Sequence, residues 1–210
     1  NHPRRRATLT CLAAGLLTAA LPAVSAAAYP DKPIRLVVPF PPGQGADILA
    51  RLIGQHLAAA LGQPIVVENK VGAGGIIGTA FAAKAAPDGY TLYMGSSGPL
   101  AIGPHVYKAV GFDTLKDFAP ISNIASVTLV LVTAPASQLA SAKDVVERAR
   151  AQPGMVPFGS AGSGTTSHLT MELFTQMSGI SLSHVPYKGS STSMIDVMAG
   201  QVPAQVDQLN

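Results

Sequence analysis

The chain has 210 residues, 48% of them hydrophobic and 12% charged, with 14 lysines and arginines against 11 aspartates and glutamates. Arg4, Arg5 and Arg6 lie before the first acid, Asp31, so the rest of the chain carries 11 charges of each sign. This balance excludes the basic surface that binding to nucleic acid or to an anionic membrane would require.

The first 26 residues have the three parts of a secretory signal peptide. Three arginines come first, an apolar run spans residues 9–21, and small residues form a cleavage pattern that ends at Ala26. The apolar run is shorter than the ~20 residues of a membrane span and is followed by Pro22, which disfavours an uncleaved anchor. We therefore predict export to the periplasm with cleavage near Ala26. The one cysteine, Cys11, would leave with this segment, so the mature chain offers no disulfide, thiolate nucleophile or cysteine metal ligand.

The next part of the chain alternates predicted strands and helices joined by short loops. Apolar runs predict strands, and residues such as Ile48, Leu49 and Ile53 recur at the helical period. The expected elements are a strand at 34–38, a helix at 46–61, a strand at 65–68, a helix at 76–86 and a strand at 90–94. Repeated strand–helix units predict a parallel sheet with right-handed crossovers.

The remainder of the chain predicts a second α/β unit. Residues 121–133 are rich in β-branched side chains and predict one long or two consecutive buried strands. Ser141 resembles the first residue of a capping box for a helix at 142–151. Further elements are expected as a strand at 156–159, a helix at 167–177 that buries Leu169, Leu173, Phe174 and Met177, a strand at 185–187 and a helix at 194–199. We place a domain boundary near Thr128, giving lobes at 29–127 and 128–210, and find no turn or helix in residues 202–210 that would finish the second unit.

Three glycine-rich loops, residues 39–47, 69–75 and 159–166, each follow a predicted strand and precede a predicted helix. Glycine is common in any such connection, but a helix start also leaves backbone N–H groups free to bind an anion. The first and third loops contain no lysine or arginine. An anion would therefore be held by peptide N–H groups and by hydroxyls, which favours a carboxylate over a polyphosphate. The candidate hydroxyls belong to Ser96, Ser97, Ser160, Thr165 and Thr166.

Sequence motifs of the common enzyme classes are missing. Neither Ser160 nor Ser163 has the flanking glycines of a G-x-S-x-G motif, and the run from Gly72 to Gly78 does not match G-x-G-x-x-G. The histidines are dispersed, so we predict no metal site and no cofactor. His168 is kept as a candidate ligand contact because it falls in the first turn of a helix that follows a glycine-rich loop.

An ordered set of segments resembles one family, the periplasmic substrate-binding proteins of tripartite tricarboxylate transporters (the Bug, or TctC-like, family). The segments are YPDKPIRLVVPFPPGQGADILAR, VENKVGAGGIIG, PDGYTLYMGSSG, FGSAGSGTTSHLTMELF and HVPYKGSS. The resemblance implies an α/β, two-lobed fold of the periplasmic-binding-protein type II (Venus flytrap) class. It also implies a monomer without catalytic activity that captures a small carboxylate for a membrane permease. Family members continue beyond residue 210, so the second lobe is expected to be incomplete.

The resemblance also implies a set of ligand-binding residues. One carboxylate clamp corresponds to Phe40, Pro42, Gly43, Gly45 and Ala46, with the Phe40 ring against the carbon skeleton of the ligand. The opposing lobe would contribute Ser160, Ala161, Gly162, Thr165 and Thr166, with Ser96 and Ser97 at the flank. The first loop departs from the family, because Gln44 and Ala46 replace a more compact, hydroxyl-bearing stretch.

Two other functions stay open at this point. The same fold and pocket could serve a ligand-loaded sensor that presents its bound state to a receptor. An exported hydrolase or isomerase in the same cleft would instead depend on Ser160, Ser163 or His168.

Overall fold

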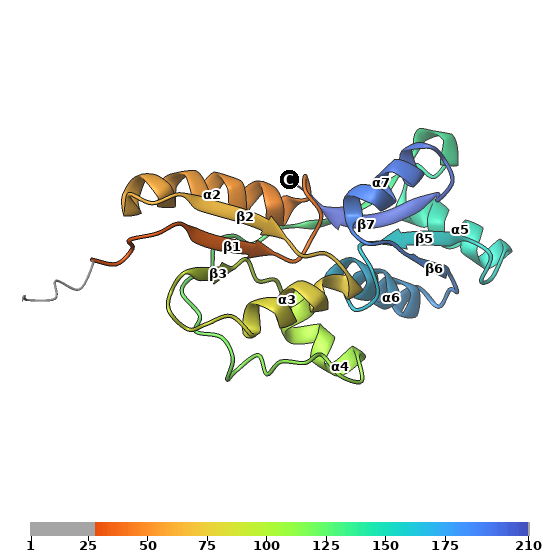
Figure 1. Cartoon of the computed structure of the whole chain (residues 1–210). Helices are drawn as coiled ribbons and strands as arrows, with labels where there is room; N and C mark the ends of the chain where they lie inside the picture. Colours follow the sequence, from red (N-terminus) through yellow and green to blue (C-terminus); the bar gives the residue numbers. More distant parts are fainter. Residues whose placement is uncertain (1–27, 210) are drawn as a thin grey trace, which may run out of the picture. The chain divides into compact units, whose positions relative to one another are not determined.

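The structure, a computed structural model, describes residues 28–209 (Figure 1). The predicted signal peptide and Cys11 lie outside the described residues. The elements below all belong to one compact unit, Lys32–Asn210. Within residues 28–209, none of the helices combines the length and the hydropathy that a bilayer-spanning helix requires.

The first sheet is parallel throughout and has the strand order β2 (Ile65–Asn69), β1 (Ile34–Val38), β3 (Thr91–Tyr93). The central strand β1 is a nearly continuous apolar run, as expected for a parallel strand with both faces covered. The helices α2 (Gly45–Leu61) and α3 (Ile76–Ala83) lie on opposite faces of this sheet in Figure 1. Leu36 and Val38 pack with Ala50 of α2 and with Met94. Helix α2 ends at Gly62, whose left-handed backbone lets its N–H reach the carbonyl of Ala58.

The second sheet has the strand order β4 (Leu129–Thr133), β7 (Ala204–Gln208), β5 (Pro157–Ser160), β6 (Ser183–Pro186). Strand β4 is antiparallel to β7, and the other pairs are parallel. Phe158 and Met171 are fully buried beside Ala204 and Val206. The helices of this part are α5 (Ala142–Ala151), α6 (Thr166–Ser178) and α7 (Ser190–Met198). The predicted α/β class with mainly parallel sheets flanked by helices is thus confirmed. The division into two lobes near Thr128 stays a prediction.

Short helical turns connect these elements. They are η2 (Ala73–Gly75), η3 (Gly98–Ile102), α4 (Gly103–Val106) and η4 (Pro135–Ser137). The first three lie between β2 and β4 along the chain, and η2 and η3 contribute backbone to the site described below.

Several predicted elements are confirmed with small shifts, and α5 has the predicted bounds. The hydroxyl of Ser141 accepts a hydrogen bond from the Asp144 N–H, as the capping pattern indicated. The short strands move by one or two residues, and α7 begins four residues earlier than predicted.

Three predictions were wrong. Residues 121–128 are exposed and form no strand, so only the end of the predicted β-branched segment, β4, joins a sheet. Strand β7 was not predicted at all. The predicted buried face of α6 was also misplaced, because Leu173 is 56% and Met177 79% exposed whereas Met171 is buried.

Candidate functional site

Asp47 holds the first glycine-rich loop in its shape. Its side chain is 3% exposed, and Oδ2 accepts hydrogen bonds from the Gly43 N–H and from Arg51 Nε, both at 2.9 Å. Oδ1 accepts from Asn69 Nδ2 at 2.9 Å and from Arg51 Nη2 at 3.0 Å. Asn69 Nδ2 also donates to the Phe40 carbonyl at 2.9 Å. Because Asn69 ends β2, this network ties the loop after β1 to the neighbouring strand.

Burial alone would raise the pKa of the Asp47 carboxyl. The hydrogen bonds from Arg51, Asn69 and Gly43 and the charge of Arg51 outweigh burial and lower that pKa below its ordinary value of 3.8. Asp47 is therefore an ionised structural group at neutral pH.

The third glycine-rich loop, between β5 and α6, uses most of its polar groups internally. The N–H groups of Ala161, Gly162 and Gly164 donate to Ser167 Oγ, Ser160 Oγ and His168 Nδ1, at 3.1, 3.1 and 3.2 Å. Thr165 Oγ1 donates to the Gly162 carbonyl at 2.6 Å. The donors best placed for a ligand are therefore the first N–H groups of α6, which have no partner within the helix.

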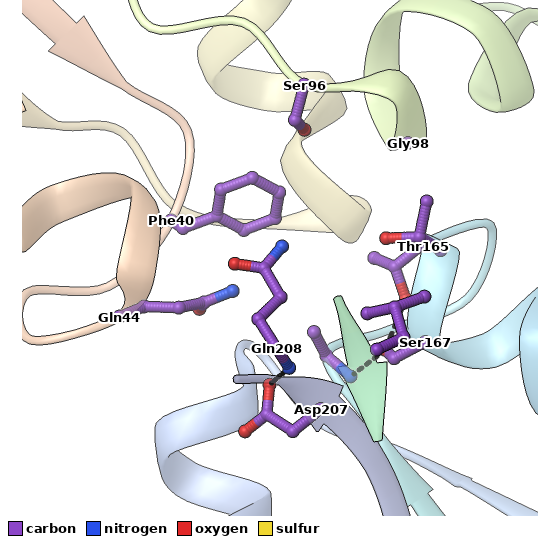
Figure 2. Close-up of a pocket in the computed structure, with 11 residues that line it drawn as sticks. Phe40, Gln44, Ser96, Gly98, Thr165, Ser167, Asp207 and Gln208 are labelled. Atoms are coloured by element: carbon purple, nitrogen blue, oxygen red, sulfur yellow. Dashed lines mark hydrogen bonds between the residues drawn. The ribbon is translucent and has the colours of Figure 1, made fainter. Parts of the chain in front are cut away.

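The first and third glycine-rich loops meet at a pocket lined from both sheets (Figure 2). Phe40 and Gln44 come from the loop after β1, Ser96 and Gly98 from the segment after β3, and Asp207 and Gln208 from the end of β7. Leu129, Ala161, Thr165, Thr166 and Ser167 complete the lining. The residues that line the pocket, all within the described part of the chain, include no lysine or arginine.

Five of the predicted ligand residues line this pocket: Phe40, Ser96, Ala161, Thr165 and Thr166. The others lie near it without contributing to its walls. Pro42, Gly43 and Ser97 are exposed, Gly45 is buried in the start of α2, and Ala46 packs on the first sheet. Ser160 and Gly162 are buried, and His168 is half-buried against another histidine. A ligand-binding role for the thirteen residues stays a prediction.

Sequence reasoning missed six residues of the lining: Gln44, Gly98, Leu129, Ser167, Asp207 and Gln208. Gln44 was noted only as a departure from the family. Asp207 and Gln208 could have been found only by placing residues 204–208 in a central strand, because the pairing with β4 and β5 brings them to the pocket.

The walls of the pocket touch each other at glycines and at one tyrosine. Tyr107 Oη donates a 2.8 Å hydrogen bond to the carbonyl of Ser163. A Cβ at Gly74 would lie 2.5 Å from the same carbonyl oxygen, and a Cβ at Gly189 would lie 2.5 Å from Cγ of Pro41. Only glycine permits this close approach of segments that belong to the two sheets.

Two histidines stack behind the third glycine-rich loop. The rings of His168 and His184 are 3.9 Å apart between centroids, and Phe158 stacks with His184 at 4.9 Å and with His168 at 6.4 Å. His184 Nε2 is 2.6 Å from Ser160 Oγ, which itself accepts from the Gly162 N–H. Burial, followed by the nearby His168, lowers the pKa of His184 to about 4, and burial also lowers that of His168.

We expect this pair to make the protein less stable in mild acid. His184 is neutral in the folded state until about pH 4, whereas an unfolded histidine takes up its proton near 6.5. The unfolded chain therefore binds more protons in that window, so stability is full above pH 6.5 and falls as pH drops toward 4. The loss should be on the order of 1–3 kcal/mol after solvent screening. Urea unfolding at several pH values should show a flatter pH dependence for His184→Gln. Exposed His56→Gln serves as control, and equal profiles for all three proteins would contradict the prediction.

Comparison with known proteins identifies the family. The sequence model of the family described as "Tripartite tricarboxylate transporter family receptor" matches residues 49–210. The chain belongs to this family. Protein BugT of Bordetella pertussis is 42% identical, over 89% of this chain and 57% of BugT.

Solved structures of similar proteins agree with this assignment. A protein of R. palustris, solved with adipate, has a TM-score of 0.83 at 37% identity, over 86% of this chain and 60% of that one. MatC from Rhodopseudomonas palustris, solved with bound malate, has a TM-score of 0.80 at 28% identity, over 86% and 61%. The chain therefore spans about three fifths of each relative. The predicted family and the periplasmic-binding-protein fold class are confirmed.

Proposed function

We propose that this chain is part of an exported solute-binding protein that captures a small carboxylate between its two sheets. The observation that carries the proposal is the start of α6, whose first N–H groups adjoin a pocket lined from both sheets. Such a helix start stabilises a carboxylate without a charged side chain. Relatives solved with adipate and with malate support the same ligand class.

The partner proposed for the loaded protein is the membrane permease of a tripartite tricarboxylate transporter, as the description of the family indicates. In this scheme the two lobes, 29–127 and 128–210, close over the ligand in the periplasm, and the permease recognises the closed form. Co-purification with a sensor kinase in place of a permease would assign the signalling role.

The burial of Ser160 beside His184 argues against a hydrolase. Ser160 and His184 lie at the distance of a nucleophile and its base. However, Ser160 is 1% exposed, its oxygen already accepts the Gly162 N–H, and it does not line the pocket. A substrate in the pocket therefore has no access to this pair. Among residues 28–209, no cluster of three histidines, cysteines or acids is arranged to hold a metal ion.

Titration calorimetry of the 210-residue chain tests the proposal. Succinate, adipate, malate and tricarballylate form the panel, with sulfate as an inorganic anion. We expect at least one organic acid to bind at 1:1 stoichiometry and sulfate not to compete. Absence of heat with every acid, while the chain remains folded by circular dichroism, would contradict the proposal.

The variant Gly189→Ala tests the role of the contact between the two walls. Its Cβ would lie 2.5 and 2.6 Å from Pro41 Cγ and Cδ and 2.9 Å from Gln44 Oε1, so the walls must separate. We expect affinity for the acid that binds to fall tenfold or more, about 1.4 kcal/mol or more. Gly54→Ala is the matched control, because its Cβ would meet only the Ile65 side chain, at 3.3 Å. Unchanged affinity in Gly189→Ala would remove this contact from the binding mechanism.

A further inference from the structure

Two peptide N–H groups of the third glycine-rich loop depend on histidine side chains. The Gly164 N–H donates to Nδ1 of His168 at 3.2 Å. The Gly162 N–H donates to Ser160 Oγ at 3.1 Å, and Ser160 Oγ lies 2.6 Å from Nε2 of His184. Both glycines are buried and have positive φ angles, 124° at Gly162 and 74° at Gly164. The loop therefore keeps a conformation that favours glycine, with two buried N–H groups satisfied through imidazole rings.

These contacts assign the proton of each ring to one nitrogen. Nδ1 of His168 accepts an N–H, so the ring proton is on Nε2, which lies 3.5 Å from a carboxylate oxygen of Glu172. Ser160 Oγ accepts from Gly162 and has its own proton to donate, and the acceptor that it contacts is Nε2 of His184. His184 therefore carries its proton on Nδ1. The two stacked rings are neutral and have opposite tautomers.

Protonation of either ring removes an acceptor from the loop. A proton on Nδ1 of His168 would face the Gly164 N–H, so two donors would point at each other. A proton on Nε2 of His184 would point at Ser160 Oγ, and the hydroxyl proton would lose its acceptor. In both cases a buried donor is left without a partner, which costs more than a typical hydrogen bond contributes.

The surroundings of the rings favour their neutral forms. Burial lowers the pKa of both histidines, and the nearby His168 lowers that of His184 further, to about 4. Among the described residues, the charged group that acts on the pair is Glu172 of α6, which favours a charged His168 but is itself half exposed. Strand β5 contributes Phe158 and Ser160, which carry no charge. The rings are therefore neutral near pH 7 and take up protons in acid.

The shape of this loop determines one wall of the pocket. Ala161 and Thr165 line that wall, whereas neither histidine lines the pocket. The Gly162 carbonyl accepts the N–H and the hydroxyl of Thr165, at 3.3 and 2.6 Å, and α6 begins directly after Thr165. Movement of Gly162 or Gly164 therefore displaces the first turn of α6, where the carboxylate is proposed to bind.

We propose that His168 and His184 are positioning residues of the carboxylate site, and that acid releases the ligand by protonating them. Each ring, in one neutral tautomer, supports a glycine N–H of the loop that leads into α6. The inference rests on the proposed function, because the site that the rings position is the one proposed for the carboxylate.

Nuclear magnetic resonance of the 210-residue chain tests the tautomers without any ligand. Long-range proton–nitrogen spectra at neutral pH should place the ring proton on Nε2 in His168 and on Nδ1 in His184. The backbone amide signals of Gly162 and Gly164 should shift as the rings are protonated, and the Gly164 response should disappear in His168→Asn. A proton on Nδ1 of His168 or on Nε2 of His184 at neutral pH overturns the inference.

Calorimetry tests the effect on binding, with whichever of succinate, adipate, malate and tricarballylate binds the wild-type chain. His168→Leu removes the acceptor of the Gly164 N–H and should weaken binding about tenfold at neutral pH. His168→Asn keeps an acceptor, Oδ1, near the position of Nδ1 and should bind within about threefold of the wild type. Between neutral pH and about pH 4.5, the wild type should lose about threefold more affinity than His168→Asn, which cannot be protonated there. The exposed His56→Asn should follow the wild type.

The outcomes distinguish this inference from the proposed function. Each pair of proteins is compared with the same acid, so titration of the ligand itself cancels. Unchanged affinity in His168→Leu, or equal losses in acid for His168→Asn and the wild type, overturns the positioning role and leaves carboxylate capture intact. Failure of every acid to bind overturns the proposed function together with the inference. If His168→Leu does not fold, the pH profiles of His168→Asn and the wild type decide.

Discussion

Replacing Asp47 with alanine is expected to lower the free energy of unfolding by about 3 kcal/mol, because it breaks a buried hydrogen-bonded charge network. The side chain is 3% exposed and accepts from Gly43, Asn69 and Arg51. Its removal leaves the Gly43 N–H without this acceptor and frees the loop that carries Phe40 and Gln44. Urea denaturation followed by circular dichroism measures the loss.

Asp144 provides a matched control for this prediction. It also lies in the first turn of a helix and accepts a backbone N–H, that of Ala140, at 2.8 Å, but it is only half-buried, and no arginine among the described residues pairs with it. Asp144→Ala should therefore cost much less than Asp47→Ala. Equal losses would show that Asp47 acts only as a helix-start acid.

The pH dependence of the free energy of unfolding provides a second test of the role of Asp47. Its pKa in the folded state is below the ordinary 3.8, so the stabilisation is fully present above that value and is lost as pH falls through the lowered folded pKa. Asp47→Ala should remove this acid-side loss. The histidine effect, which lies between pH 6.5 and 4, should remain in the variant.

Replacing Gly78 with alanine is expected to destabilise the fold by about 3 kcal/mol, at the upper end of the usual cost of overpacking. The Cβ would lie 2.5 Å from the Lys70 carbonyl oxygen, 2.8 Å from Pro39 Cα and 3.0 Å from Pro39 Cβ. Two of these are backbone atoms that no side-chain rotation can move. Helix α3 would have to withdraw from the loop after β1, and the thermal midpoint and the urea midpoint should both fall.

Gly54→Ala is again the matched control, because both glycines lie inside helices. Alanine has the higher helix propensity, so Gly54→Ala should be neutral or gain up to about 1 kcal/mol. A similarly small change in the free energy of unfolding for Gly78→Ala would show that the loop after β1 can move to make room for the methyl group. The close packing of α3 on Pro39 would then not be needed for stability.

The elements that sequence reasoning predicted well are those whose signals are local. The apolar run of β1, the helix α2 with Gly62 behind it and the Ser141 cap of α5 each contain their own start or stop signal. Ser96 and Thr165, which line one pocket, were predicted from the rule that loops after parallel strands share an edge. These predictions depend on signals between residues close in sequence and on the topology of parallel sheets. Phe40 and Ala161, which line the same pocket, were predicted only from the family resemblance.

The elements it missed depend on long-range packing. Residues 121–128 have strand-forming side chains but no neighbouring strand among the described residues, and Ile121 is 83% exposed. Strand β7 was missed because three of its five residues are polar, among them the fully buried Gln205. The continuous apolar run that marks a strand covered on both faces is therefore missing from it. Missing β7 meant missing Asp207 and Gln208 in the pocket.

The place of β7 in the second sheet has a consequence for how the protein is made. Strands β4 and β5 have no hydrogen bonds to each other, and each pairs with β7, which follows them by dozens of residues. Such non-local pairing is slow to form. During synthesis, Phe158 and the apolar residues of β4 therefore stay uncovered by β7 until that strand has been made. During that interval the chain exposes the most apolar surface to a chaperone, and it is then most prone to aggregate.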